Sequence, residues 1–326
     1  MSSDPASAAL PHPTLRIGVS SCLLGEEVRY DGQHARSRYV TDHLARFAEF
    51  VSVCPELDAG LGTPRPALRI VRRDGESRLE TSSTGEDLTE RFHAAADARM
   101  DRLDELGELD GYVVKKSSPS CGMERVKIYA ASGGGSRDGV GLFTARLRER
   151  YPLLPVEEEG RLNDPVLRER FLLRAWSRRR WRAAREAGLT RSRIVAFHTA
   201  HKLLVRTHDE RAYRSLGRLV ASFGEMPDAE LFARYGEELQ QTLAVPASRG
   251  RHVNALQHAL GYLKDALHPN EKQEILTACA DYQAGIVPLI VPVAMIRAHV
   301  RTHRIEYLLD QVYFDPYPKE LALRSV

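Results

Sequence analysis

Apolar runs and polar turns alternate along the first half of the chain. Three short apolar stretches, LRIGVS from Leu15, FVSV up to Val53 and GYVV from Gly111, each lead into a polar turn that contains a cysteine. Helical spacing of apolar positions predicts helices between them, from about Arg36 to Phe50 and from about Asp87 to Leu109. This repetition of strand, turn and helix is typical of a parallel α/β sheet.

The end of this first region is also patterned. A further helix over Leu142–Arg150 and a strand near Leu153–Val156 are expected to close the domain. The Gly-rich stretch ASGGGSRDG between them lacks the Lys-Ser/Thr of a P-loop and the spacing of a dinucleotide fingerprint. It therefore predicts a surface loop, and no nucleotide cofactor is expected.

Beyond about residue 160 the apolar positions follow helical spacing. Gly, Pro and short polar turns separate five expected helices: His198–Phe223, Asp228–Thr242, Asn254–Leu267, Glu271–Ala284 and Val293–Val312. The predicted fold class is thus an α/β parallel-sheet N-terminal domain followed by an all-α C-terminal domain. The expected boundaries are a disordered tail over 1–13, the α/β domain over 14–160, a basic helical connector over 161–189 and the helical domain over 190–326.

Charge is divided unevenly between the two regions. Residues 1–160 carry 21 Lys and Arg against 26 Asp and Glu, a net charge of −5, whereas the remainder carries 26 against 18, a net charge of +8. This asymmetry indicates a polyanionic partner for the second region. No apolar run is long enough to cross a bilayer and the N-terminus has no signal pattern, so a soluble, cytoplasmic protein without a membrane partner is expected.

Three of the four cysteines follow predicted strands: Cys22, Cys54 and Cys121. Loops that leave the carboxyl ends of parallel strands gather at one edge of the sheet, so these thiols are expected to converge. Three thiolates suit a three-cysteine zinc site or an iron-sulfur cluster with one iron free of protein ligands. Three unrelated loop thiols are the alternative. Cys279 has helical surroundings and is interpreted as a small buried hydrophobic residue.

The motifs VSSCLLGEEVRYDGQH, VCPELDAGLGTPRP and VKKSSPSCG together resemble the thiouracil desulfidase family. The resemblance implies a 4Fe-4S cluster held by Cys22, Cys54 and Cys121, with the fourth iron open for the sulfur of a thiolated pyrimidine. It also implies that Glu56 is the catalytic acid and base and that Ser118 positions substrate or water. Turn formation is the alternative role for these last two residues.

Further residues of the motifs are candidates for substrate binding. Lys116 and Ser120 stand in the loop of the third cysteine, and Asp31 stands in the RYDG segment. For Asp31, an ion pair with Arg29 that anchors the loop is the alternative interpretation.

The segments FHTAHKLLVRTHDERAYRSLGRLVA and LQHALGYLK resemble the helical YbgA-like domain, over about residues 190–315. That domain also occurs fused to desulfidase domains. The fusion favours a thiolated nucleotide within tRNA, because Lys and Arg neutralise an RNA phosphate backbone. The candidate RNA contacts are Arg178, Arg179, Arg180, Arg182, Lys202, Arg206, Arg214 and Arg218.

Two tryptophans and three histidines of this region each have more than one possible role. Trp176 or Trp181 is a candidate for stacking on a base. His198, His201 and His208 are interpreted as structural or RNA-facing side chains, since no HExxH-type partner accompanies them.

The expected function is iron-sulfur-dependent, non-redox desulfidation of thiouridine in tRNA, with 4-thiouridine as the favoured substrate and hydrogen sulfide as the second product. One alternative is a desulfidase of free thiouracil, in which the helical domain stabilises or dimerises the enzyme. Another is a non-enzymatic tRNA-binding protein with a structural or sensory three-cysteine metal site. Sulfur insertion is disfavoured, because that reaction activates the base with ATP and the sequence contains no convincing nucleotide-binding motif.

Overall fold

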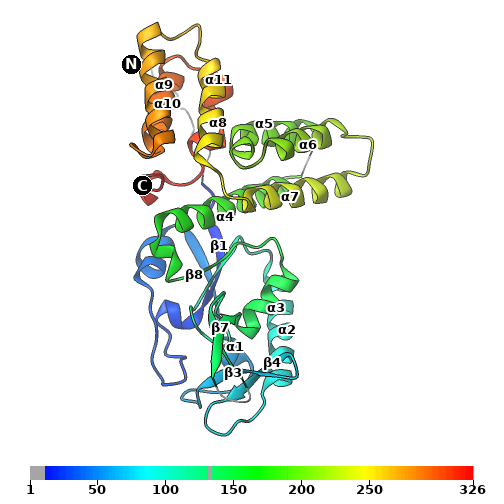
Figure 1. Cartoon of the computed structure of the whole chain (residues 1–326). Helices are drawn as coiled ribbons and strands as arrows, with labels where there is room; N and C mark the ends of the chain where they lie inside the picture. Colours follow the sequence, from blue (N-terminus) through cyan, green and yellow to red (C-terminus); the bar gives the residue numbers. More distant parts are fainter. Residues whose placement is uncertain (1–11, 131–133, 189, 326) are drawn as a thin grey trace, which may run out of the picture. The chain divides into compact units, whose positions relative to one another are not determined.

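The computed structural model describes residues 12–130, 134–188 and 190–325 (Figure 1). Residues 14–171 form one compact unit, here called the α/β unit, and residues 172–326 together with the N-terminal end of the chain form a second, the helical unit. The predicted order of an α/β domain followed by an all-α domain is confirmed. Helix α4 (Pro165–Glu186) contains the boundary between the units, within the stretch that the sequence assigned to a connector.

Most of the expected disordered tail, residues 1–11, lies outside the described residues. The prediction is wrong for its last two residues, which are held by side chains of the helical unit. Trp176 Nε1 donates a hydrogen bond to the Pro13 carbonyl oxygen at 3.2 Å, and Arg180 Nη2 lies 3.1 Å from His12 Nδ1.

A four-stranded parallel sheet forms the centre of the α/β unit. Its strands are β1 (Leu15–Ser20), β2 (Ala48–Val53), β5 (Gly111–Val114) and β8 (Val156–Glu158), in the spatial order β2-β1-β5-β8. All neighbouring pairs are parallel. Every residue of β5 is buried, as expected for a parallel strand covered on both faces. The carboxyl ends of β1, β2 and β5 therefore lie at the same edge, where the cysteine loops begin.

A second, mixed sheet was not predicted from the sequence. It contains β3 (Leu68–Arg73), β4 (Glu76–Thr81), β6 (Val126–Ala130) and β7 (Gly135–Gly139), in the order β4-β3-β6-β7. The Gly-rich stretch that was interpreted as a surface loop supplies β7, which pairs antiparallel with β6. Four of the five β7 residues are exposed, so the strand lacks the apolar alternation by which strands are recognised.

The expected helix over residues 36–50 is also wrong. Short helical turns over Tyr39–His43 and Leu44–Arg46 occupy part of it, and β2 already begins at Ala48. Val40 and Leu44 are fully buried. Their helical spacing thus reflects a buried helical face, but that face extends over two short turns and not over a full helix.

Three helices of the α/β unit are regular: α1 (Pro55–Asp58), α2 (Thr89–Leu106) and α3 (Leu142–Arg150). Phe92 and Met100 of α2 and Phe143 of α3 pack with Tyr112 of β5 in one hydrophobic cluster. Each such buried side chain contributes about 1.5–3 kcal/mol relative to its exposure. This core fixes the sheet edge that carries the cysteine loops.

The helical unit continues from α4 with α5 (Arg191–His208), α6 (Glu210–Ala221), α7 (Asp228–Ala244), α8 (Arg249–Gly261), α9 (Pro269–Ala284), α10 (Ile290–Thr302) and α11 (Glu306–Leu309). The expected helix over His198–Phe223 is in fact two helices. The Asp209 carboxylate accepts hydrogen bonds from the backbone N–H groups of Arg211 and Ala212 and so begins α6. The expected helix over Val293–Val312 is likewise divided between α10 and α11. No helix in the described part of the chain is long and apolar enough to cross a membrane.

Candidate active site

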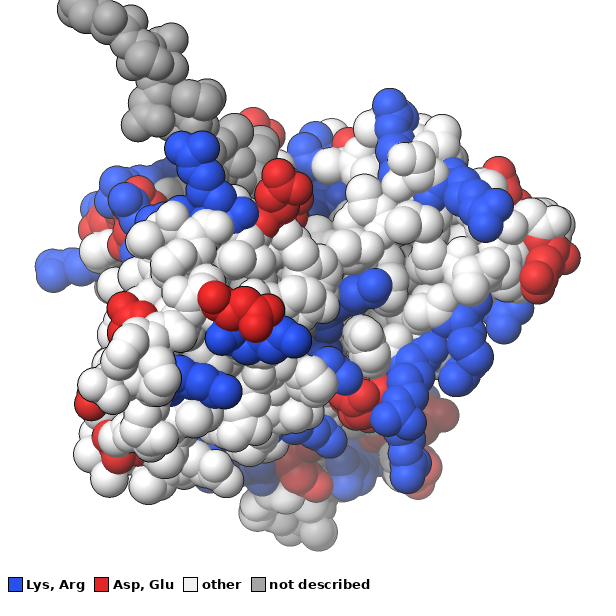
Figure 2. Space-filling view, turned by 90° about the horizontal axis from the view of Figure 1, so that it is seen from above, with Lys and Arg blue, Asp and Glu red and all other residues white. Residues whose placement is uncertain are grey.

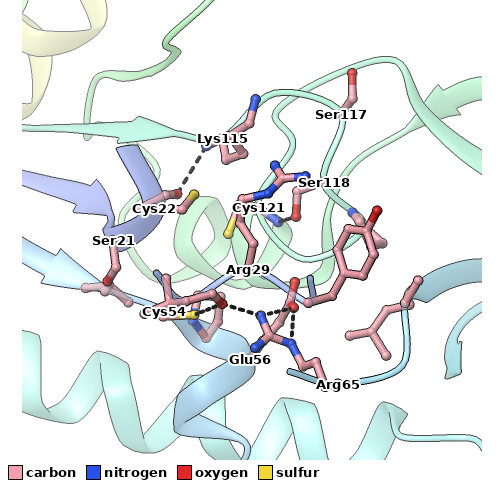
Figure 3. A pocket seen from close by; sticks show the side chains of 18 of the residues that line it. Ser21, Cys22, Arg29, Cys54, Glu56, Arg65, Lys115, Ser117, Ser118 and Cys121 are labelled. Atoms are coloured by element: carbon pink, nitrogen blue, oxygen red, sulfur yellow. Dashed lines mark hydrogen bonds and ion pairs between the residues drawn. The ribbon is translucent and has the colours of Figure 1, made fainter. Parts of the chain in front are cut away.

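A pocket of about 410 Å³ lies in the α/β unit (Figure 3), and Cys22, Cys54 and Cys121 all line it. Cys22 stands in the short helical turn after β1, Cys54 in the position before α1, and Cys121 in the loop after β5. The structure thus brings together the three cysteines at the sheet edge that the strand order predicted. Cys279 is buried in α9, within the other unit.

The pocket thiols are free; Cys22 and Cys121 are buried, and Cys54 is partly buried. Burial raises the pKa of Cys22 to about 11 and also raises the pKa values of Cys54 and Cys121. Each thiolate is further disfavoured by a neighbouring negative charge. A bound cation removes this penalty, because a coordinating thiol is deprotonated outright. The three side chains are therefore suited to ligate a positively charged centre.

Within residues 12–130, 134–188 and 190–325, no group of three His, Cys, Asp or Glu side chains is arranged to hold one metal ion. In a four-iron cluster each cysteine binds a different iron, so the ligands surround a common space instead of converging on a point. The three cysteines line one pocket.

Glu56 lines the same pocket from the first turn of α1. Arg65 Nε donates to Glu56 Oε2 at 2.7 Å, and Arg65 Nη2 lies 2.5 Å from the same oxygen. Ser120 Oγ donates to Glu56 Oε1 at 2.7 Å. The carboxylate is thus held from two sides by groups that are distant in sequence.

Arg65 is a site residue that the sequence interpretation missed. Its side chain is only 3% exposed. Besides Glu56 it donates to the carbonyl oxygens of Gly62 at 2.6 Å and Val28 at 2.7 Å. These bonds connect the loop after β1 with the loop after α1. The sequence feature that could have indicated Arg65 is the arginine inside the motif GLGTPRP. The sequence does not show that this arginine contacts Glu56.

The two serines of the Cys121 loop have different roles. Ser118 lines the pocket, and its Oγ accepts hydrogen bonds from the backbone N–H groups of Ser120 and Cys121 at 3.2 and 3.1 Å. The turn-forming role of Ser118 is therefore present together with its place at the pocket. Ser120 is fully buried and points to Glu56. Its hydroxyl is therefore directed at the carboxylate, and a direct contact between Ser120 and substrate stays a prediction.

The start of α3 fixes the Cys121 loop. The Phe143 backbone N–H donates to the Ser120 carbonyl oxygen at 2.9 Å, and Thr144 Oγ1 donates to the Cys121 carbonyl oxygen at 2.5 Å. Gly141 permits this close approach, because a Cβ atom there would lie 2.5 Å from the Ser120 carbonyl oxygen. The loop is thus held by a rigid helix.

Two lysines line the pocket, of which the sequence interpretation singled out one. Lys116 is exposed, and its backbone N–H donates to Glu159 Oε2 at 2.7 Å. The Lys115 ammonium group, which was missed, forms an ion pair with the same carboxylate and lowers the pKa of Cys22 against the effect of burial. A positive charge thus stands beside this thiol.

Asp31, whose contact with substrate stays a prediction, forms contacts within its own loop. Its carboxylate lies 3.5 Å from Arg29 Nε and accepts a hydrogen bond from the Gln33 backbone N–H at 3.1 Å. Arg29 and Tyr30 line the pocket, whereas Asp31 is absent from the described lining. The loop-anchoring ion pair is therefore the better interpretation.

Arg182, one of the arginines proposed to contact RNA, is buried in the helical unit, whereas Arg180 is partly exposed. Arg180 Nη2 donates to the Pro316 carbonyl oxygen at 2.6 Å, and burial lowers the pKa of Arg180 to about 10. Arg182 is 7% exposed. Arg182 is too deeply buried to contact a phosphate in this structure. Arg180 is partly exposed, so its RNA contact stays a prediction. The remaining candidates, Arg178, Arg179, Lys202, Arg206, Arg214 and Arg218, are at least partly accessible.

The tryptophans and histidines of this region belong to the core. Trp176 is fully buried and Trp181 is 6% exposed, so neither can stack on a base. His198, His201 and His208 are buried as well. Burial lowers the pKa of His198 to about 4 and that of His201 to about 3. Of the two interpretations left open, the structure favours the structural one.

Comparison with known proteins gives two family matches that divide the chain in the same order. A family model described as 2-thiouracil desulfurase matches residues 17–159. A second, DUF1722, described as a protein of unknown function, matches residues 202–318.

Individual relatives follow the same division. The uncharacterized protein YbbK of Bacillus subtilis (strain 168) is 34% identical over 155 residues, which cover 45% of this chain and 98% of YbbK. The uncharacterized protein YbgA of Escherichia coli (strain K12) is 27% identical over 154 residues, covering 47% of this chain and 91% of YbgA. A solved structure described as the 4Fe-4S-dependent thiouracil desulfidase TudS is 34% identical and covers 46% of this chain and 95% of that chain, with a TM-score of 0.38.

Proposed function

Because the chain belongs, through residues 17–159, to the 2-thiouracil desulfurase family, we propose that it removes sulfur from thiouridine in tRNA. Water and the thiolated base give uridine and hydrogen sulfide, and 4-thiouridine is the favoured substrate. The observation that carries the proposal is the pocket in which three free cysteines face a glutamate fixed by an arginine and a serine.

We assign the cofactor as a 4Fe-4S cluster held by Cys22, Cys54 and Cys121. A cluster with one iron free of protein ligands supplies a Lewis acid for the substrate sulfur when it is bound. The shared pocket and the buried thiols support this assignment. Each of the three Cys→Ala variants is expected to lose bound iron together with turnover, whereas Cys279→Ala keeps both. Chemical iron determination after anaerobic reconstitution checks this, and full iron content in any pocket variant would remove that cysteine from the ligand set.

Glu56 is proposed as the base that activates water. A carboxylate oxygen has two acceptor positions. Among the described residues, Oε2 receives two nitrogens of Arg65, whereas Oε1 receives Ser120 Oγ alone. Oε1 therefore keeps one free acceptor position and is the atom that takes a proton from the attacking water. The same oxygen then returns a proton to the ring nitrogen or to the departing sulfide.

Ser118 is proposed to position the substrate or the water. Its oxygen is occupied as an acceptor by two backbone N–H groups. Its hydroxyl proton is then left to donate into the pocket that the side chain lines. Arg65 and Ser120 act through Glu56 and are positioning residues.

The choice of tRNA over a free base is supported by the second half of the chain. That half carries a net charge of +8, which a pocket for a small neutral base does not require. Arg214 and Arg218 of α6 are exposed. On the face shown in Figure 2, Lys and Arg side chains are spread over the surface with acidic ones among them. On this face the candidate phosphate contacts are therefore separate residues.

Two other functions remain to be separated from this one. A desulfidase of free thiouracil would act equally well without RNA. A non-enzymatic protein with a structural metal site would not need a glutamate fixed inside the pocket, so the contacts of Glu56 count against it.

The test uses anaerobically purified protein with a reconstituted cluster, incubated with bulk tRNA or with free 4-thiouracil. Thiolated nucleosides are counted after digestion of the RNA. Loss of 4-thiouridine from tRNA is expected. Turnover of the free base alone would overturn the tRNA assignment, and no turnover of either would overturn the desulfidase assignment.

A further inference from the structure

A pair of stacked tyrosines lies at the surface of the helical unit. Tyr262 follows α8 directly and Tyr307 belongs to α11, and their ring centroids are 4.5 Å apart with an interplanar angle of 25°. Tyr262 is 53% exposed, whereas Tyr235 and Tyr313 of the same unit are fully buried. The Tyr262 ring is therefore stacked on one side and accessible to solvent over much of its surface.

An arginine and a third tyrosine adjoin this pair. The Arg206 guanidinium lies 4.6 Å from the centroid of the Tyr213 ring, within the range of a cation–π contact. Glu210 fixes it through hydrogen bonds of 2.7 and 3.1 Å from Nε and Nη2. Arg206 also acts electrostatically on Tyr307. We call Arg206, Tyr213, Tyr262 and Tyr307 the tyrosine platform; its members come from α5, α6, the end of α8 and α11.

Helices α5, α6 and α8, which carry or precede members of the tyrosine platform, are net basic, whereas Glu306 is the one charged residue of α11. Helices α5, α8 and α10 contain no Asp or Glu. Residues 191–221, which span α5 and α6, contain seven Lys and Arg against two Asp and Glu. Arg211, Arg214 and Arg218 are exposed and share one face of α6, because their spacing is three and seven residues. An anionic ligand is thus attracted to this region.

An accessible aromatic ring in a positive field fits single-stranded nucleic acid. Unpaired bases stack on aromatic side chains while basic side chains follow the phosphates. A duplex hides its bases and offers chiefly phosphates and sugars. We propose that the tyrosine platform binds an unpaired nucleotide of RNA, with Tyr262 stacking on the base. This inference rests on the proposed tRNA substrate and names which part of the RNA the helical unit recognises.

The test measures binding of the full-length protein to a single-stranded RNA of about 12 nucleotides and to a duplex of the same length. Tyr262→Ala is expected to weaken binding of the single strand by about 5- to 150-fold, the range of one lost base stack. Duplex binding is expected to stay unchanged. Tyr262→Phe keeps the ring and should retain most of the single-strand affinity.

Two further binding measurements separate the contribution of base stacking from that of positive charge. Arg218→Gln removes an exposed charge and is expected to weaken binding of both RNAs. Polyglutamate serves as an anionic chain without bases, and its binding should not respond to Tyr262→Ala. The proposal is wrong if Tyr262→Ala leaves single-strand affinity unchanged, or if it weakens duplex or polyglutamate binding equally.

The outcome is independent of the chemistry in the pocket, because binding is read directly and the platform lies in the helical unit. Turnover of free 4-thiouracil by Tyr262→Ala should equal that of the unmodified protein. A protein that binds single-stranded RNA through Tyr262 but desulfidates nothing would overturn the proposed function alone.

Discussion

Glu56 is fixed by contacts that leave one acceptor position of Oε1 free. Glu56→Gln is expected to lower turnover by about 10²–10⁴-fold, the usual contribution of a positioned acid or base. The three cysteines are unchanged, so iron content should be retained. Anaerobic kinetics together with iron determination check this.

Glu49→Gln is a matched control, since Glu49 is an exposed residue of β2. The Glu49→Gln variant should leave turnover and iron content unchanged. Retention of full turnover in Glu56→Gln would remove Glu56 from the mechanism.

A second prediction for a single residue concerns Arg65. Arg65→Met leaves Glu56 and the Val28 carbonyl oxygen without their partner in a mostly buried place. Losing one member of a buried ion pair costs about 3–5 kcal/mol; Glu56 keeps 15% exposure, so about 3 kcal/mol is expected. Urea unfolding measures this loss, and kcat should fall more than KM rises.

Arg65→Lys separates charge from geometry, because lysine cannot reproduce the planar fork. It should recover part of the stability and little of kcat. Arg72→Met, at an exposed position of β3, is the control. A kcat for Arg65→Met equal to that of the control would show that Arg65 does not position Glu56.

At the scale of elements, the cysteine-bearing strands could be predicted because β1, β2 and β5 are short apolar runs that end in polar turns. Their convergence follows from parallel order alone. The second sheet was not predictable in this way, since β7 is polar and exposed. The break between α5 and α6 depends on the cap at Asp209, which apolar periodicity does not reveal. The Arg65–Glu56 pair depends on tertiary contacts between loops.

Helix α5 provides a pH prediction. Burial lowers the pKa of His198 to about 4 and that of His201 to about 3. The unfolded chain has histidine pKa values near about 6.5, so below that pH it binds protons that the folded helix does not. Stability of the helical unit is therefore complete above about pH 6.5 and falls as the pH is lowered toward 4.

Urea unfolding followed at several pH values between about 7.5 and 4.5 measures this effect. His201→Gln should reduce the pH dependence, because one of the buried titrating groups is gone. An unfolding free energy of the helical unit that stays constant down to pH 4.5 would contradict the structure.

At the scale of the whole molecule, an acidic unit with a reactive pocket is joined to a basic helical unit. If the basic unit binds tRNA, the logarithm of its binding constant falls linearly with the logarithm of the salt concentration. The steepness of this line decreases by about 0.7–0.9 for each phosphate contact removed. The double variant Arg214→Gln, Arg218→Gln should raise KM for tRNA and lower this slope. Turnover of free 4-thiouracil should not change.

Arg214 and Arg218 are suitable for this test because both are exposed, so that replacing them removes no buried contact. Kinetics with tRNA at several salt concentrations measure the effect. An unaltered KM and slope would place the RNA contacts elsewhere.

We propose above that the pocket around Cys22, Cys54, Cys121 and Glu56 hydrolyses a carbon–sulfur bond in tRNA. Anaerobic, iron-loaded protein and its Glu56→Gln variant, matched in iron content, are incubated with tRNA, and 4-thiouridine and sulfide are quantified. The unmodified protein is expected to convert 4-thiouridine to uridine with one sulfide per base, while the variant does so at most slowly. Unchanged 4-thiouridine and no sulfide with the iron-loaded, unmodified protein would contradict this proposal.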